Sequence, residues 1–199
     1  MSCDYLKGFR TELKPVNPEM LYAIEYINSI SSSNIFKSNV LEVGLGTGRK
    51  SIRLSELFER FYGIEPDPEL YKIFTDSCTE SNCKITSYNM DFDTFVSETN
   101  LKFDLIILEN VIHFIELDDF IVKSKQILNP DGYILIKNPK AIPAGWGNKE
   151  FCADSDKFDE VKWIRFRTQL KEIYSRLDNS EYLIKKNSTN TSHFFILKI

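Results

Sequence analysis

The stretch VLEVGLGTGRK spans residues 40–50 and contains three glycines in five positions, Gly44, Gly46 and Gly48. The apolar residues before them predict a buried strand, and the residues after them predict a helix. Glycines at such a turn let a ligand approach the main chain and place it near the amino terminus of the helix. Glu42 lies just before the glycines. The stretch therefore predicts a ligand site in which bare backbone and a negative charge occur together.

Apolar runs alternate with amphipathic stretches along the chain, which indicates a β-α-β order. We expect strands at residues 39–43, 60–64, 83–88, 103–109 and 132–137. We expect helices between them at residues 48–59, 67–78 and 117–128. The runs FDLIILE and YILIK are continuous rather than alternating, which is typical of parallel strands that helices cover on both faces. The predicted fold class is therefore α/β.

The two ends of the chain predict further elements. NPEMLYAIEYINSI predicts an amphipathic helix, with Asn17 suited to its cap and Pro18 to its first turn. We expect this helix to lie over the mouth of the ligand site. A long helix over about residues 156–178 leads to EYLIKKNSTNTSHFFILKI, whose two extended runs are joined by the polar NSTN. The sheet should therefore have seven strands, mostly parallel, with helices on both faces and a C-terminal antiparallel hairpin.

Composition narrows the class of protein. At 199 residues, with 42% hydrophobic content, the chain is predicted to form one domain over residues 1–199. The net charge of −4 is spread without long blocks of one sign, which disfavours nucleic acid as a partner. No apolar run indicates a membrane span or a secretory leader, so we expect a cytoplasmic protein. The four cysteines lack a CxxC pair, so neither a zinc site nor a disulfide framework is predicted, and reduced thiols are expected.

The charge of Glu42 bears on the choice of ligand. Dinucleotide sites use G-x-G-x-x-G, and this chain has Arg49 where their third small residue stands. Glu42 would repel a diphosphate but suits a ligand that carries an ammonium and a sulfonium. An NAD-dependent oxidoreductase is therefore the weakest of the functions considered. The alternative is that Glu42 is a salt-bridged carboxylate beside a structural turn.

The segment LEVGLGTGR resembles the first motif of the class I S-adenosylmethionine-dependent methyltransferases, an acidic residue followed by G-x-G-x-G. The resemblance covers residues 38–137 and implies a Rossmann-like, cofactor-binding core. It implies that the glycine loop, with Leu45, cradles the methionine and ribose end of S-adenosylmethionine, and that Glu42 helps to hold the amino group. Residues 1–37 would form a helical cap, and residues 138–199 a substrate loop, a helix and the closing hairpin.

The same resemblance extends through RFYGIEPDPEL and SYNMDFDTF. It implies that Glu65, after the second strand, binds the ribose hydroxyls, whereas Asp67 caps the next helix. It implies that Asp91 contacts the adenine amino group, and that Met90 and Phe92 lie against the ring. The alternative for these three residues is a loop with two core side chains. Two further positions, Pro66 and Asn110, complete the predicted cofactor site.

The fourth strand in KFDLIILENVIHFIE is expected to end at the reaction centre, because ligands bind outside the carboxyl ends of parallel strands. Glu109 and His113 are the candidate catalytic residues there. His113 is suited to act as a base, since its ordinary pKa is close to neutral. Packing against the sheet is an equally good interpretation of His113. No metal site is predicted.

The sequence thus favours an S-adenosylmethionine-dependent methyltransferase that acts on a small-molecule acceptor. Two alternatives remain open: a methyltransferase for protein or nucleic acid, and a catalytically silent scaffold that binds the cofactor. The segment 138–155 holds Trp146 between two glycines and is interpreted either as a lid or as a loop with a buried tryptophan. Neither the acceptor nor the methylated atom follows from the sequence.

Overall fold

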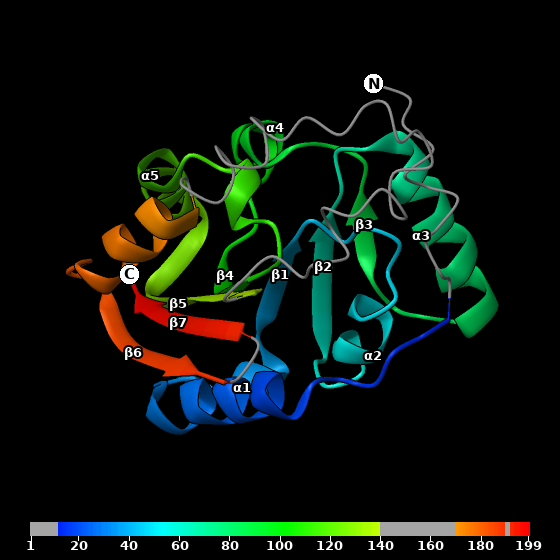
Figure 1. Ribbon diagram of the computed structural model, residues 1–199. Helices are drawn as coiled ribbons and strands as arrows, with labels where there is room; N and C mark the ends of the chain where they lie inside the picture. The colour runs from blue at the N-terminus through cyan, green and yellow to red at the C-terminus, as the bar shows by residue number, and fades with distance from the viewer. Residues whose placement is uncertain (1–11, 140–169, 190–191) are drawn as a thin grey trace, which may run out of the picture.

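The described residues form one mixed sheet that carries helices on both faces (Figure 1). The computed structural model describes residues 12–139, 170–189 and 192–199. In these ranges the sheet has seven strands in the order β3-β2-β1-β4-β5-β7-β6. The strands are β1 Asn39–Val43, β2 Arg60–Ile64, β3 Thr86–Tyr88, β4 Phe103–Glu109, β5 Leu128–Pro139, β6 Leu183–Ser188 and β7 Ser192–Lys198. Strands β1 to β5 pair in parallel, and β7 runs antiparallel to β5 and β6. The predicted α/β fold with a C-terminal antiparallel hairpin is confirmed.

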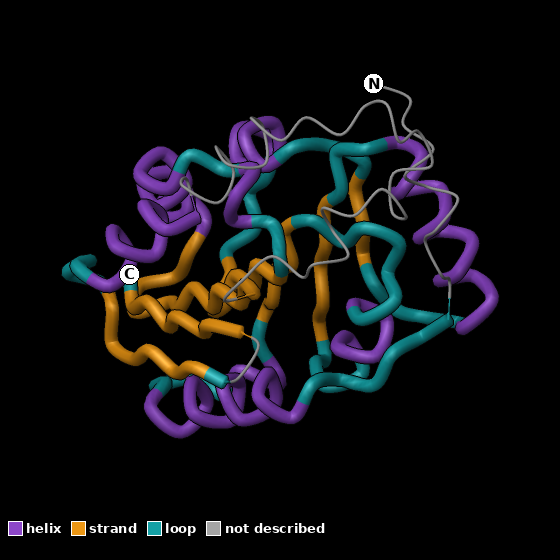
Figure 2. Tube along the Cα trace, viewed as in Figure 1, coloured by secondary structure: helices purple, strands orange, loops and turns teal. Residues whose placement is uncertain are grey.

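Helices alternate with the first five strands, as Figure 2 shows. The helices and short 3-10 turns are α1 Pro18–Ile30, η2 Ile35–Lys37, α2 Ser51–Ser55, α3 Pro68–Ser81, α4 Phe92–Glu98, η3 Ile112–Phe114 and α5 Leu117–Ile127. The helix predicted over about residues 156–178 lies within the described ranges only from residue 170, and residues 170–178 are helical. Among the helices that the structure describes, none is long and apolar enough to cross a membrane.

Helix α1 packs on one face of the sheet rather than over its edge. Four of its residues are buried in a cluster with side chains of β1, β4, β5 and β7: Met20, Ala23, Ile24 and Ile27. Helices α4 and α5 lie on the opposite side of the sheet (Figure 1). The expectation that the first helix covers the mouth of the ligand site is therefore wrong, because its apolar stripe is used on the sheet.

Helix α2 is shorter than predicted, with five residues in place of the range 48–59. Gly48 has a positive φ of 77° and belongs to the preceding loop. After Ser55 the chain leaves the α-helix, and the Leu57 N–H donates to the Leu54 carbonyl at 3.1 Å. The glycine loop thus uses residues that sequence periodicity assigns to the helix.

Strand β5 is longer than predicted and begins at Leu128 rather than at residue 132. Leu128 pairs with Phe103 before a shift in register, and Asp131 has a positive φ of 64°. An aspartate tolerates this conformation better than most residues, so the irregular turn stays within the strand. Strand β3 covers only part of the range 83–88, and helix α4 was not predicted.

A disulfide joins Cys78 and Cys83, so the expectation of reduced thiols is wrong for this pair. The two Cα atoms lie 5.0 Å apart at the end of α3. Asn82 takes the left-handed conformation there, with φ of 52°, and turns the chain back toward the helix. The pairing depends on this turn, and the absence of a CxxC spacing does not reveal it.

The cap of α1 is suited to a stability test. Asn17 Oδ1 accepts hydrogen bonds from the backbone N–H groups of Glu19 at 2.8 Å and Met20 at 3.4 Å. We expect Asn17→Ala to lower the free energy of unfolding by about 1 kcal/mol, because two backbone donors lose their acceptor. Chemical denaturation measures the change. Asn17→Asp is the control that keeps the acceptor, and an equal loss in both variants would contradict the capping role.

Candidate active site

The glycine loop between β1 and α2 has three residues in left-handed backbone conformations. The φ angles are 84° at Gly44, 56° at Gly46 and 77° at Gly48. A Cβ atom at Gly44 would lie 2.4 Å from Val111 Cγ1, and one at Gly48 would lie 2.6 Å from Phe74. A Cβ atom at Gly46 would meet nothing within 4 Å. The loop therefore packs closely at its two ends and has open space at Gly46, where a ligand can reach the main chain.

Glu65 binds this loop from the carboxyl end of β2. The Gly46 N–H donates to Oε2 at 2.8 Å, and the Asp67 N–H donates to Oε1 at 3.0 Å. The side chain of Asn89 donates to the Glu65 carbonyl at 2.7 Å. Burial raises the pKa of Glu65, although the two N–H donors act against this shift. Each carboxylate oxygen still has a free lone pair for a ligand hydroxyl.

Glu42 is buried at the carboxyl end of β1, with 2% of its surface exposed. Burial raises the pKa of its carboxyl group from 4.5 to about 8, against the lowering effect of a hydrogen bond with Ser51. Its Oε2 atom has no hydrogen-bond partner among the residues that the structure describes. Those residues also give Glu42 no ion pair, so they do not support the alternative of a salt-bridged Glu42. With this pKa the group is mostly protonated at neutral pH, and a cation beside it would favour the charged form.

Sequence reasoning missed two lysines at this edge of the sheet, Lys50 and Lys137. Lys50 Nζ lies 2.5 Å from Glu109 Oε1, and Lys137 forms an ion pair with the same oxygen. Burial alone would raise the pKa of Glu109, but the two ammonium groups outweigh it and hold the pKa below its ordinary value. The usable signal in the sequence was Lys137, a charged residue that ends the apolar run YILI.

His113 lies in the 3-10 turn η3, directly after β4, and is partly buried. Burial lowers the pKa of His113 to about 4. The imidazole is therefore neutral at pH 7, and its ring centroid lies 4.0 Å from that of Phe114. Asn110 precedes this turn with a positive φ of 62° and donates its backbone N–H to the Lys137 carbonyl at 2.8 Å. This bond fixes the loop after β4 to the end of β5.

The residues predicted to contact adenine have structural roles in the fold. Asp91 is exposed and caps α4, where its Oδ1 accepts from the Thr94 N–H at 2.8 Å, and this bond lowers its pKa. Phe92 is buried, and its ring centroid lies 4.6 Å from that of Phe120. Met90 is partly buried against the same core. Contact of these three residues with adenine stays a prediction.

Three other predicted residues differ in exposure or role. Leu45 is buried under the glycine loop in a cluster with Ile52 and Phe74. Pro66 is exposed. Asp67 caps α3 by accepting from the Glu69 N–H at 2.8 Å, as predicted. The structure therefore brings together Glu42, Glu65, Glu109 and the three glycines around the carboxyl ends of β1, β2 and β4.

Comparison with known proteins identifies the domain. The model of a methyltransferase domain family matches residues 40–132, the segment from the glycine loop to the start of β5. The chain carries a class I S-adenosylmethionine-dependent methyltransferase domain. S-adenosylmethionine is the cofactor of such a domain. No curated protein matches this methyltransferase.

Solved structures share the fold of this methyltransferase at low sequence identity. A hypothetical protein from Thermus thermophilus is 10% identical, with a TM-score of 0.59 over 96% of this chain and 94% of that protein. Magnesium protoporphyrin IX methyltransferase from Synechocystis, solved with bound S-adenosylmethionine, is 14% identical. Its TM-score is 0.54, over 90% of this chain and 77% of that protein. Ribosomal protein L11 methylase from Lactobacillus delbrueckii is 15% identical, with a TM-score of 0.52 over 93% of this chain and 80% of that protein. These likenesses show the fold.

Glu42 gives this methyltransferase a pH-dependent stability. The unfolded chain loses this proton near pH 4.5 and the folded chain near pH 8. The unfolded state therefore binds fewer protons between these values, and the free energy of unfolding falls as pH rises through this range. We expect Glu42→Gln to differ little from the parent near pH 4.5 and to be more stable at pH 8, by up to about 1.4 kcal/mol for each pH unit between. Thermal melts across this range measure the difference, and equal Tm values at pH 8 would contradict it.

The glycine loop predicts different effects for two similar substitutions in the methyltransferase. Gly44→Ala places a Cβ atom 2.4 Å from Val111 at a φ of 84°, so we expect a loss of stability of more than about 1 kcal/mol. Gly46→Ala meets no neighbour, so we expect a smaller loss of stability and a clear loss of cofactor affinity, because its methyl group enters the open space. Denaturation and calorimetry measure the two effects. Equal destabilisation by both substitutions would refute this division of roles.

Proposed function

We propose that this methyltransferase transfers the methyl group of S-adenosylmethionine to a small-molecule acceptor. The observation that carries the proposal is the contact between Glu65 and the Gly46 N–H, which holds a carboxylate beside an open glycine loop. Such a pair offers acceptor oxygens to ribose hydroxyls and bare main chain to the rest of the ligand. The residues present therefore fit the cofactor.

The cofactor roles follow from position along the sheet edge. We assign the ribose to Glu65 and the methionine end to the loop that contains Gly44, Gly46 and Gly48. Buried Glu42 supplies a negative charge for the ammonium, at the cost of releasing its proton when the cation binds. The remaining assignments rest on the same sequence resemblance and concern Leu45, Pro66, Met90, Asp91, Phe92 and Asn110.

The charges of the site favour alignment over base catalysis. When bound, S-adenosylmethionine supplies a methyl group that its sulfonium already activates. His113, with a pKa near 4, is neutral at pH 7 but a weak base. Glu109 is held in its charged form by two lysines, which lower its pKa, and it is a poor proton acceptor as well. These residues therefore suit an acceptor whose nucleophilic atom does not need a strong base, and the site contributes mainly by orienting it.

Charge also supports a small acceptor over a macromolecular one. The fold alone does not choose, since one structural neighbour is named for a porphyrin and another for a ribosomal protein. The net charge of −4, without a long basic block, gives no attraction for a nucleic-acid backbone. We therefore propose that the protein is a small-molecule methyltransferase. The cytoplasmic location expected from the sequence stays a proposal.

Calorimetry with the purified protein tests the cofactor assignment. We expect S-adenosylmethionine and S-adenosylhomocysteine to bind and NAD not to bind. Glu65→Ala should weaken both cofactor complexes by about 1.5 to 3 kcal/mol, the usual contribution of hydrogen bonds to a charged group. Asp67→Ala is the control, because it removes a helix cap next to the site but no assigned ligand. Unchanged affinity in folded Glu65→Ala protein would remove Glu65 from the site.

A metabolite screen with methyl-labelled cofactor tests the acceptor class. Label that enters a low-molecular-weight fraction supports the proposal. Label that enters only protein or nucleic acid would replace it with the macromolecular alternative. Cofactor binding without transfer to any fraction would favour the silent scaffold.

A further inference from the structure

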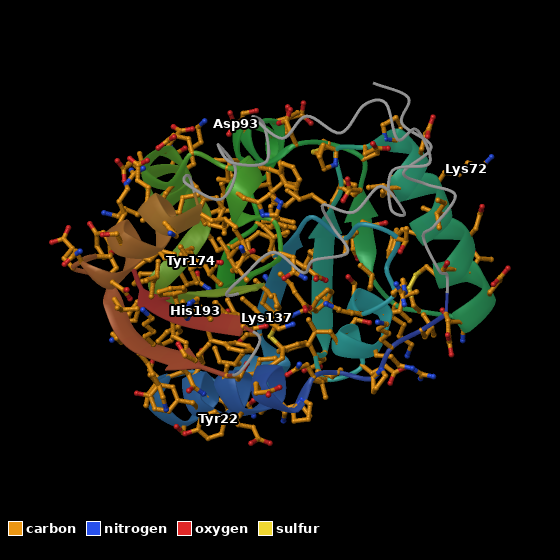
Figure 3. All side chains as sticks on the ribbon, viewed as in Figure 1. Tyr22, Lys72, Asp93, Lys137, Tyr174 and His193 are labelled. Carbon is orange, nitrogen blue, oxygen red and sulfur yellow. A yellow bond between two sulfur atoms is a disulfide. The ribbon has the colours of Figure 1, made fainter. Side chains whose placement is uncertain are left out.

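Lys50, Glu109 and Lys137 form a charged cluster at the carboxyl ends of β4 and β5. Lys50 Nζ lies 2.5 Å from Glu109 Oε1, and Lys137 pairs with that same oxygen from the neighbouring strand, where it stands in register with Glu109. Lys137 pairs with Phe194, and Figure 3 labels it beside the first residues of β7. The cluster thus joins the residue that follows the glycine loop to the two strands beside the predicted reaction centre.

The cluster has more positive than negative charge. Among the residues that the structure describes, the two ammonium groups share one carboxylate, and the nearby Glu42 is protonated at neutral pH in the absence of a bound cation. The side chain of Lys137 is only 7% exposed, so water solvates it poorly. Buried charges are costly unless they are paired, and here one carboxylate serves two cations.

The two lysines differ in their access to a ligand. The side chain of Lys50 is 38% exposed, whereas those of Glu109 and Lys137 are each 7% exposed. Lys50 therefore has donor hydrogens available on its solvent side, since an ammonium has three. Glu109 holds both ammonium groups at one oxygen and so keeps them close together. Lys50 is therefore the direct donor to an anion that approaches the end of the glycine loop, and Lys137 adds positive charge behind it.

We propose that Lys50 and Lys137 form a binding subsite for a carboxylate, with Glu109 as the residue that positions them. The inference rests on the proposed function and extends it to residues that sequence resemblance does not assign. A carboxylate beside Lys50 would supply the missing negative charge, and charge-assisted hydrogen bonds to it are stronger than neutral ones. The α-carboxylate of the cofactor and a carboxylate on the acceptor are the two sources of this chemistry.

Two ligands that differ at the amino-acid end test whether the subsite binds the α-carboxylate of the cofactor. S-adenosylhomocysteine has the ammonium and carboxylate, and 5′-methylthioadenosine lacks both. We expect Lys50→Met to weaken S-adenosylhomocysteine about tenfold to a hundredfold in calorimetry and to leave 5′-methylthioadenosine unchanged. Lys137→Met should also weaken the binding of S-adenosylhomocysteine. If Lys137→Met does not fold because Lys137 is buried, Lys50→Met alone decides the test. Lys72→Met, on the exposed surface of α3 (Figure 3), is the matched control.

The complex with S-adenosylhomocysteine is used to test whether the subsite binds a carboxylate of the acceptor. Acetate is added at constant ionic strength, and the Tm of the complex is measured. A rise in Tm that is lost in Lys50→Met, together with unchanged affinity for S-adenosylhomocysteine, assigns the subsite to the acceptor. If neither S-adenosylhomocysteine affinity nor the acetate effect depends on Lys50 or Lys137, the subsite is refuted and the proposed function stands. If wild-type protein binds neither nucleoside, the proposed function fails, and the subsite fails with it.

Discussion

The hydrogen bond from the Gly46 N–H to Glu65 joins the two strands on which the site depends. It connects the loop after β1 to the end of β2 at 2.8 Å, and Glu65 also fixes the start of the next loop through the Asp67 N–H. The loop can take this path because its glycines adopt positive φ angles that other residues avoid. One carboxylate thus organises the backbone of both loops.

At the carboxyl edge of the sheet, the described residues carry more positive than negative charge at neutral pH. Burial keeps Glu42 protonated at neutral pH, while Glu109 stays charged because two lysines contact it. In the proposed site, a ligand cation would favour the charged form of Glu42, and a ligand anion would lie near Lys50.

Local sequence patterns predicted many features correctly. The caps Asn17 and Asp67 were identified because a capping side chain and its backbone donors lie within three residues of one another. The mostly parallel sheet was predicted because continuous apolar runs are typical of buried parallel strands, and because the resemblance covers the core. Boundaries were less accurate: Gly48 belongs to the loop rather than to α2, and β5 begins early at Leu128 through an irregular turn. Periodicity reports burial and not the hydrogen bonds that end an element.

The sequence by itself determined the α/β class, the glycine loop and the acids that follow the strands, because each depends on neighbouring residues. Only the tertiary structure decided which charges meet. Lys50 and Glu109 are 59 positions apart, and Glu109 and Lys137 are 28 apart. Pairing of β4 with β5 brings Glu109 beside Lys137, and the path of the chain after β1 brings Lys50 to Glu109. The disulfide likewise depends on the turn at Asn82 and not on a known spacing. Burial, which shifts the pKa values of Glu42 and His113, is a property of the packed chain, and no local motif contains it.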